Sequence, residues 1–244
     1  MNRNGTFMTT PWQSAVTKGI AAATRNRVPA MALWIFGALL ITSYHCIPAV
    51  HDGLESVGRL KTSWGWVFSM ISTGIFGGLI PVLLPKLLNH ERAKISWEIV
   101  ISSTLLWAYK GVETDYFYRL QGVLFGTTAD IATIATKTLI DQFVWVPLFG
   151  LVNVMMFYCW RDNGYSFRRT WQSLGAAWYW SQVLPVLIAN WVVWIPAVLM
   201  IYALPSALQI PVQNLILCLW VLVLVFFTAP SNATADNPNS ADES

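Results

Sequence analysis

The sequence has few charged residues: Asp, Glu, Lys and Arg make up 11% of its 244 positions, whereas apolar residues make up 55%. An average soluble domain has about 25% charged residues, so this composition excludes an ordinary water-soluble protein. Several uncharged windows reach about 20 residues, the length that an α-helix needs to cross a bilayer. The sequence therefore predicts an all-α fold, a polytopic bundle of transmembrane helices.

Cysteine and histidine are also scarce, with three of each. Cys46, Cys159 and Cys218 lie far apart in apolar runs, so we interpret them as packing residues rather than as a disulfide framework. The histidines lack the spacing of metal ligands. The sequence also lacks a P-loop, a dinucleotide-binding glycine motif, a nucleophile elbow and a dense basic run. We therefore expect no metal, no cofactor, no catalytic activity and no nucleic-acid partner.

Hydropathy predicts six membrane spans and one helix that lies at the interface. The third span either continues as one tilted helix to Leu120 or ends at Tyr109. Residues 170–182 mix Trp and Tyr with small polar residues, which suits an interfacial helix. The six expected spans cover about 30–50, 64–84, 96–120, 139–160, 184–204 and 212–228.

Lysine and arginine are distributed unevenly among the segments that join these spans. With both termini on the inner side, ten of them fall in inner segments and five in outer ones, which fits the positive-inside rule. Residues 1–29 form a basic tail without acidic residues, either an organellar targeting segment or a tail that holds the first span in place. The rest divides into N-terminal membrane helices (30–94), a membrane core (95–228) and a polar tail (229–244) expected to be disordered.

Charged residues gather in the second half of the third span, where Lys110, Glu113, Asp115 and Arg119 follow one another closely. If this half lies at membrane depth, these side chains must face protein or water rather than lipid. If the helix ends at Tyr109, they belong to a solvated loop. The sequence leaves both interpretations open.

Two short motifs predict local structure. The small residues of Gly74-Ile-Phe-Gly77-Gly78 form a face that lets another helix approach closely. The pattern Thr127-x-x-Asp130 is typical of a capping box at the start of the helix that enters the fourth span.

The stretch from Lys137 to Pro147 combines features that are costly inside a membrane. Lys137 and Asp141 are four residues apart, so on a helix they are expected to form an ion pair. Gln142 adds an amide, and Pro147 lacks a backbone donor, which leaves the carbonyl of Phe143 without its usual partner. Such a combination in a span indicates function. The equally favoured alternative is that Lys137 and Asp141 anchor the helix end at the membrane surface.

A second proline-containing segment echoes the first. Val144-Trp-Val-Pro147 recurs as Val193-Trp-Ile-Pro196 in the next span. Proline-interrupted segments at corresponding positions of two repeats can mark a midplane site, and we expect Pro147 and Pro196 to kink their helices. Four residues also recur by chance, and chance explains the echo at least as well.

The chain resembles the membrane-protein family typified by the mitochondrial inner-membrane protein Mpv-seventeen and the twenty-two-kilodalton peroxisomal membrane protein. The resemblance covers about residues 95–228, and three blocks carry it in the family's order. These blocks are Gly111-Val-Glu-Thr-Asp115-Tyr-Phe117-Tyr118, then Lys137-Thr-Leu-Ile-Asp141-Gln142 with Pro147, and finally Asn190-Trp-Val-Val-Trp194-Ile-Pro196 with Leu204-Pro205 and Trp220.

The sequence also departs from the family pattern. Asp115 stands where many members have His, Val112 replaces a proline, and Ile195 is inserted before Pro196. The polar residues that follow the late tryptophan in relatives are here Val221-Leu-Val-Leu-Val, which predicts a drier path or none. Residues 30–50 are an additional N-terminal span by comparison with the family.

The resemblance implies a protein that takes part in the permeation of small solutes across an organellar membrane. We expect a channel or transporter-like pore, in the mitochondrial inner membrane by preference, with a peroxisomal or bacterial inner membrane as alternatives. The second hypothesis is a non-conducting accessory subunit of a larger membrane complex, and membrane lipids and further copies of the chain are the other expected partners. A lipid-directed enzyme would have only scattered carboxylates available. The expected polar path contains Lys137, Asp141, Gln142, Glu113, Asp115 and Asn190, beside the aromatic residues Phe117, Tyr118, Trp194 and Trp220.

Overall fold

A computed structural model describes residues 10–88 and 96–228 of the chain. Over these residues 90% are helical and there is no strand, so the expected all-α fold is confirmed. Within these described residues, five helices are long and apolar enough to cross a membrane, and they correspond to five of the six expected spans. The tail 229–244 and the first nine residues lie outside the described part of the chain.

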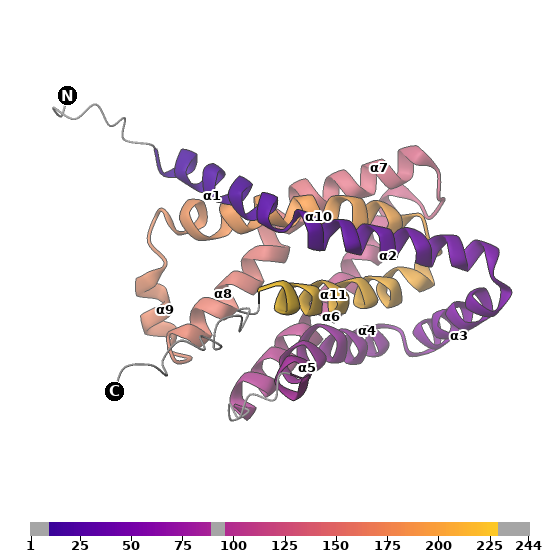
Figure 1. Cartoon of the computed structure of the whole chain (residues 1–244), viewed down its shortest axis with the longest axis horizontal. Helices are drawn as coiled ribbons and strands as arrows, with labels where there is room; N and C mark the ends of the chain where they lie inside the picture. The colour runs from indigo at the N-terminus through magenta and orange to yellow at the C-terminus, as the bar shows by residue number, and fades with distance from the viewer. Residues whose placement is uncertain (1–9, 89–95, 229–244) are drawn as a thin grey trace, which may run out of the picture.

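The helices follow one another with short connections (Figure 1). Three of the long helices contain a π-helical segment, labelled η, that continues directly from one α-helix or into the next. The elements are α1 (Pro11–Arg25), α2 (Arg27–Cys46), α3 (Pro48–Trp64), α4 (Trp66–Thr73), η1 (Gly74–Leu79), α5 (Ile80–Leu88), α6 (Trp97–Phe125), α7 (Ile131–Ile140), η2 (Asp141–Gly150), α8 (Leu151–Asp162), α9 (Phe167–Ser173), η3 (Tyr179–Val183), α10 (Leu184–Tyr202) and α11 (Ser206–Thr228).

The apolar core lies where α2 packs against the pair α10 and α11. On α10 and α11 its members recur at four-residue spacing, so each of these two helices presents one continuous stripe to its neighbours. In Figure 1, α1 runs beside α10, and α2 lies beside both α10 and α11. The buried stripe consists of Leu33 on α2, of Val193, Ala197 and Ile201 on α10, and of Leu208, Val212 and Ile216 on α11.

Glycines bring the segment α4–η1 against α6. A Cβ atom on Gly78 would lie 2.7 Å from the Cα atom of Thr104, and one on Gly74 would lie 3.2 Å from the Cβ atom of Ala108. The close approach predicted for this glycine face is therefore confirmed. Gly111 does the same from the α6 side, because its Cβ would meet the backbone carbonyl of Ser69 at 2.2 Å.

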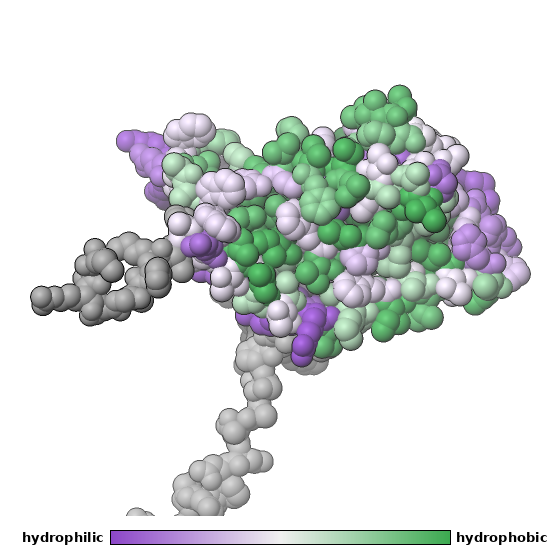
Figure 2. Space-filling view, turned by 90° about the horizontal axis from the view of Figure 1, so that it is seen from above, coloured by the Kyte–Doolittle hydropathy of each residue, from purple (hydrophilic) through white to green (hydrophobic). Residues whose placement is uncertain are grey.

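The exterior of the bundle is strongly apolar. Figure 2 shows hydrophobic residues over much of the middle of one face, with hydrophilic residues gathered toward its ends. Leu39, Leu105 and Leu148 are each more than half exposed. Side chains of this kind suit contact with lipid tails.

The third expected span is one continuous helix of 29 residues, α6, so the interpretation that the helix ends at Tyr109 is wrong. Arg119 near the end of this helix is exposed, but Lys110 and Asp115 face protein, at 8% and 1% exposed. This burial satisfies the condition that such groups must meet at membrane depth.

Three local features differ from the sequence-based expectations. Residues 170–182 do not form one helix, because α9 ends at Ser173 and η3 begins at Tyr179. The stretch between the first two spans is the amphipathic helix α3, for which no helix was expected. The cap of α7 is Asp130 itself, which accepts hydrogen bonds from Thr133, so Thr127 does not form the expected capping box.

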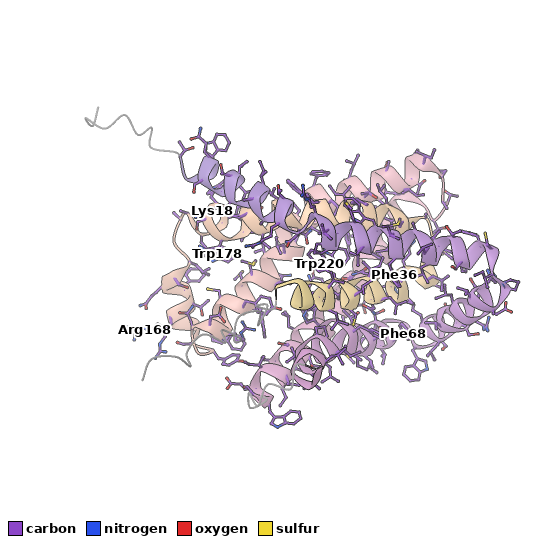
Figure 3. All side chains as sticks on the ribbon, in the orientation of Figure 1. Lys18, Phe36, Phe68, Arg168, Trp178 and Trp220 are labelled. Atoms are coloured by element: carbon purple, nitrogen blue, oxygen red, sulfur yellow. The ribbon has the colours of Figure 1, made fainter. Side chains whose placement is uncertain are left out.

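The basic residues give a partial view of orientation. Lys18 on α1 and Arg168 on α9, which the positive-inside count assigns to the same side, lie toward the same end of the molecule in Figure 3. The expectation that both termini lie on the inner side of the membrane stays a prediction.

Candidate functional site

The stretch around Pro147 folds as the π-helical segment η2, between the α-helices α7 and α8. A π-helix bonds each N–H group to the carbonyl five residues earlier, and such segments often accompany functional sites. In this register the donor that Pro147 lacks would have served Gln142, not Phe143 as expected. Trp191 of α10 replaces it, because its indole Nε1–H donates to the Gln142 carbonyl at 2.7 Å.

Two further carbonyls of η2 accept hydrogen bonds from outside their own helix. Tyr179 donates its hydroxyl to the carbonyl of Pro147 at 3.1 Å. Lys110 of α6 donates from Nζ to the carbonyl of Gly150 at 3.0 Å. These bonds fasten the irregular segment to η3 and α6, which meets the need for backbone polar groups in a membrane to find partners within the protein.

A half-open cavity of about 250 Å³ lies between the helices beside η2. Its walls come mainly from α6, η2, α10 and α11, with smaller contributions from α4 and α8. Seven of the residues that the sequence singled out meet there: Asp141, Gln142, Asn190, Phe117, Tyr118, Trp194 and Trp220. In Figure 3, Trp220 lies on α11 in the middle of the molecule. Residues far apart in the sequence thus line one cavity with polar and aromatic side chains.

Asp141 is 5% exposed, and its carboxylate is held by α10. Tyr202 donates its hydroxyl to Oδ2 at 2.7 Å, and the side-chain amide of Gln142 donates to Oδ1 at 3.2 Å. The expected ion pair between Lys137 and Asp141 is not formed, because the carboxylate is directed to α10 and takes these two donors. Lys137 is buried, and its Nζ lies 5.8 Å from the centre of the Tyr202 ring, in a cation–π arrangement.

Amide groups at the cavity differ in how they are paired. Gln142 is 2% exposed, yet its Oε1 accepts no hydrogen bond from the described residues, and Oε1 of Gln213 is likewise buried without a donor among them. Asn190 lines the cavity but does not bond across helices as expected. Asn214 does so instead, accepting from Thr73 at 2.9 Å and donating to Ser72 at 2.8 Å.

Aromatic rings form much of the cavity wall. Phe117 and Trp145 stack with their ring centres 4.2 Å apart and their planes 11° from parallel. Tyr118 packs at 5.1 Å from Tyr202, the ring that also binds Asp141. The rings on the cavity are those of Trp107, Phe117, Tyr118, Trp145, Trp194 and Trp220.

The other two carboxylates expected on the polar path are already paired with cations. Glu113 accepts from Lys110 at 2.6 Å and from the Asn153 amide at 3.1 Å. Asp115 lies 2.5 Å from Nζ of Lys61, and Arg119 Nε is 2.8 Å from its other oxygen, close but not aligned for a hydrogen bond. Neither Glu113 nor Asp115 lines the central cavity.

Asp115 lines a second cavity, of about 520 Å³, together with Lys61 and Arg119. This cavity lies between α3, α6 and the start of α11. Tyr118 belongs to the walls of both the charged cavity and the central one.

The two prolines act differently. Pro147 accompanies a change to π-helical geometry, whereas α10 remains α-helical from Leu184 to Tyr202 through Pro196. The indole of Trp34 on α2 donates to the carbonyl of Val193 at 3.2 Å, just before Pro196. Of the two expected kinks, only that at Pro147 is visible as a change of helix type.

Several residues of the site were missed by the sequence analysis. Lys61 lies on α3, where no helix was expected, and Tyr202 showed no signal beyond its position in an apolar span. Lys110 was recognised as a charge at membrane depth but was not placed on the polar path, and Gln213 could have been found as a polar residue four positions before Leu217 of the same cavity. Within residues 10–88 and 96–228 no group of three or more His, Cys, Asp or Glu side chains could hold a metal ion.

Comparison with known proteins adds nothing to these residues: no family model, no curated protein and no solved structure matches the chain. The resemblance to the Mpv-seventeen family therefore rests on its three sequence blocks and stays a prediction.

Proposed function

We propose that this membrane protein forms a narrow, gated path for small solutes, as a channel or a transporter. The observation that supports this most strongly is the cavity between the helices, which places Asp141, Gln142 and Asn190 among aromatic rings. Buried polar groups in a membrane bundle are costly unless they have partners, and those without partners often mark a functional site. Gln142 Oε1 has no hydrogen-bond partner among the described residues, which favours a functional role.

The path combines the two cavities. The charged cavity at Asp115 and the central cavity at Asp141 share Tyr118 as a common wall residue. A change in the rotamer of one ring is a small movement, and side-chain rotation is fast compared with helix movement. Tyr118 is therefore the gate in this proposal, and the irregular segment η2 is the element that can shift beside it.

The path favours cations. Glu113 and Asp115 are neutralised by Lys110, Lys61 and Arg119. Asp141 has only neutral hydrogen-bond donors, Tyr202 and Gln142. A carboxylate without an ion partner attracts positive charge into a cavity of low dielectric constant.

The test is single-channel recording from the purified protein in planar bilayers, with Asp141→Asn beside the wild type. Glu98→Gln is the matched control, because Glu98 is an exposed carboxylate in the first turn of α6 and lies away from the cavity. We expect discrete currents that Asp141→Asn reduces or makes less cation-selective and that Glu98→Gln leaves unchanged.

Silence from well-folded protein in bilayers, together with no solute flux into vesicles, would overturn the proposal. The accessory-subunit hypothesis would then take its place. The exposed aromatic residues Phe167 and Trp171 of α9, 79% and 78% accessible, offer such a subunit a docking surface, and isolation in mild detergent would show a stoichiometric partner.

A further inference from the structure

The central cavity has the features of a binding site, not only of a passage. Its polar groups on η2 are a buried carboxylate, Asp141, and a buried amide oxygen, Gln142 Oε1, which accepts no hydrogen bond. Six aromatic side chains surround them. Acceptors and π-faces both attract positively charged N–H donors.

We propose that the central cavity binds a small organic ammonium ion, with its charge near Asp141 and the aromatic faces and an N–H group directed at Gln142 Oε1. That the bound ion is also transported rests on the proposed function, whereas its binding does not.

The positive groups near the cavity do not replace such a ligand. Lys110 lines the cavity, but its Nζ donates to the Glu113 carboxylate and to the Gly150 carbonyl. Lys137 is not part of the cavity wall, and its Nζ lies over the Tyr202 ring. Neither lysine therefore pairs with the side-chain oxygens of Asp141, which remain open to a cationic ligand.

The chemistry of the walls discriminates among cations. A bare metal ion requires several oxygen ligands around it, whereas among the described residues Asp141 is the one carboxylate on this wall and six aromatic rings surround it. Aromatic faces attract organic ammonium ions, which are weakly hydrated and carry apolar surface. The walls therefore favour an organic ion over sodium, potassium or a divalent metal.

The size of the cavity limits the ligand. Its 250 Å³ equals about eight water molecules at roughly 30 Å³ each. Pockets for drug-sized ligands begin at about 300 Å³, so the cavity fits an ammonium ion with a short alkyl or aryl group.

A matched series of probes separates the contributions. We would titrate purified protein in lipid nanodiscs with butylammonium, butanol, butyrate and tetramethylammonium, following heat and tryptophan fluorescence. Butylammonium and butanol have the same carbon chain and differ in charge, butyrate reverses the charge, and tetramethylammonium keeps the charge but has no N–H group. We expect butylammonium to bind most tightly, tetramethylammonium more weakly, and the other two at least about tenfold more weakly, a difference of about 1.4 kcal/mol.

Variants then assign the interaction to residues. Asp141→Asn should weaken butylammonium binding by about tenfold or more, and Gln142→Met should weaken it while reducing its advantage over tetramethylammonium. Glu98→Gln, an exposed carboxylate outside the cavity, should leave all affinities unchanged. Because Asp141→Asn risks misfolding, Gln142→Met provides the independent test, since it removes no charge.

Equal affinities for butylammonium and butanol, or unchanged butylammonium binding in both cavity variants, would overturn the proposal. Failure of this inference is distinguishable from failure of the proposed function. Ammonium binding that depends on the cavity residues, without flux into vesicles, would support the ammonium site and overturn the proposed path. Flux of neutral or anionic solutes without ammonium binding would support the path and overturn the ammonium site.

Discussion

The helix pair α10 and α11 has two faces that meet different surroundings. The face toward α2 carries only apolar side chains, and its six core residues are at most 1% exposed. The face toward α6 and η2 carries amides and aromatic rings, and there the packing leaves a cavity. The first face includes Val193, Ala197, Ile201, Leu208, Val212 and Ile216, and the second includes Asn190, Trp194, Val198, Gln213, Leu217 and Trp220.

The difference shows how one apolar helix serves both stability and a polar site. Residues of each face recur at four-residue spacing, so a shift of one position along the helix changes the environment from dry to polar. A hydropathy window averages over all residues of each turn, so it cannot distinguish the two faces. In this bundle polar residues are tolerated where α6 and η2 supply partners for them.

The largest expected effect comes from placing the same amide on each face. Val193→Asn puts a polar group among apolar side chains at a position with no exposed surface, and we expect a loss of about 2–3 kcal/mol in the free energy of unfolding. Val198→Asn makes the same change on the cavity face, where water and other amides can bond to it, and should cost less than half as much. Unfolding in mixed detergent micelles measures both. Equal losses would show that the two faces do not differ in polarity.

The next effect concerns the close contact between α4 and α6, two helices that contribute to the cavity wall. In Gly111→Ala the new Cβ would lie 2.2 Å from the Ser69 carbonyl, so α4 and α6 must separate, at a cost of about 1–3 kcal/mol. Gly53→Ala on α3 is the control, because nothing lies within 4 Å of its Cβ position, and helix propensity predicts a gain of about 0.5–1 kcal/mol. Thermal unfolding in detergent gives both values. An unchanged free energy of unfolding in Gly111→Ala would mean that α4 and α6 are not closely packed at this contact.

Part of the fold and of the candidate site was predictable from the sequence. The close helix approach at Gly74 and Gly78, and the placing of Asp141 and Gln142 at one polar site, followed from local patterns. Small residues permit close packing, and polar groups in an apolar span must face protein or water. The spans were predictable for the same reason, since an uncharged window of membrane length has few alternatives.

The rest depended on contacts that no local pattern contains. Lys61 and Asp115 are 54 residues apart, and α3 is too polar for a hydropathy window to detect as a span. The π register of η2 moved the unpaired carbonyl from Phe143 to Gln142, a shift that tertiary bonds from Trp191 stabilise. The Lys137–Asp141 pair was expected from helical spacing alone, and Tyr202 took the carboxylate instead.

A smaller effect is expected at the charged cavity. Lys61→Gln removes one of two cations beside buried Asp115, and because Arg119 remains, we expect a loss of about 1–2 kcal/mol, below the roughly 3–5 kcal/mol for breaking an isolated buried pair. Arg59→Gln on the exposed side of α3 is the control and should be nearly neutral. A double-mutant cycle with Asp115→Asn measures the coupling. Additive losses in that cycle would show that Lys61 and Asp115 do not interact.

The smallest effect lies outside both faces, at the cap of α7, and it depends on pH. Hydrogen bonds from the Thr128 hydroxyl and from the backbone N–H of Thr133 hold the pKa of Asp130 below its usual range. A lowered pKa in the folded state stabilises the protein above the unfolded pKa, about 3.9, and this contribution disappears as the pH falls through the folded value.

Asp130→Ala should therefore lower the melting temperature slightly at pH 7, and the difference from the wild type should narrow below about pH 4. The control is Asp52→Ala on α3, an exposed carboxylate whose side chain makes no hydrogen bond within the described residues. Melting curves from pH 7 to pH 3 measure the two differences. A gap for Asp130→Ala that stays constant across this range would show that the carboxylate charge does not contribute to the cap, and that neutral hydrogen bonding alone starts the helix leading to the cavity.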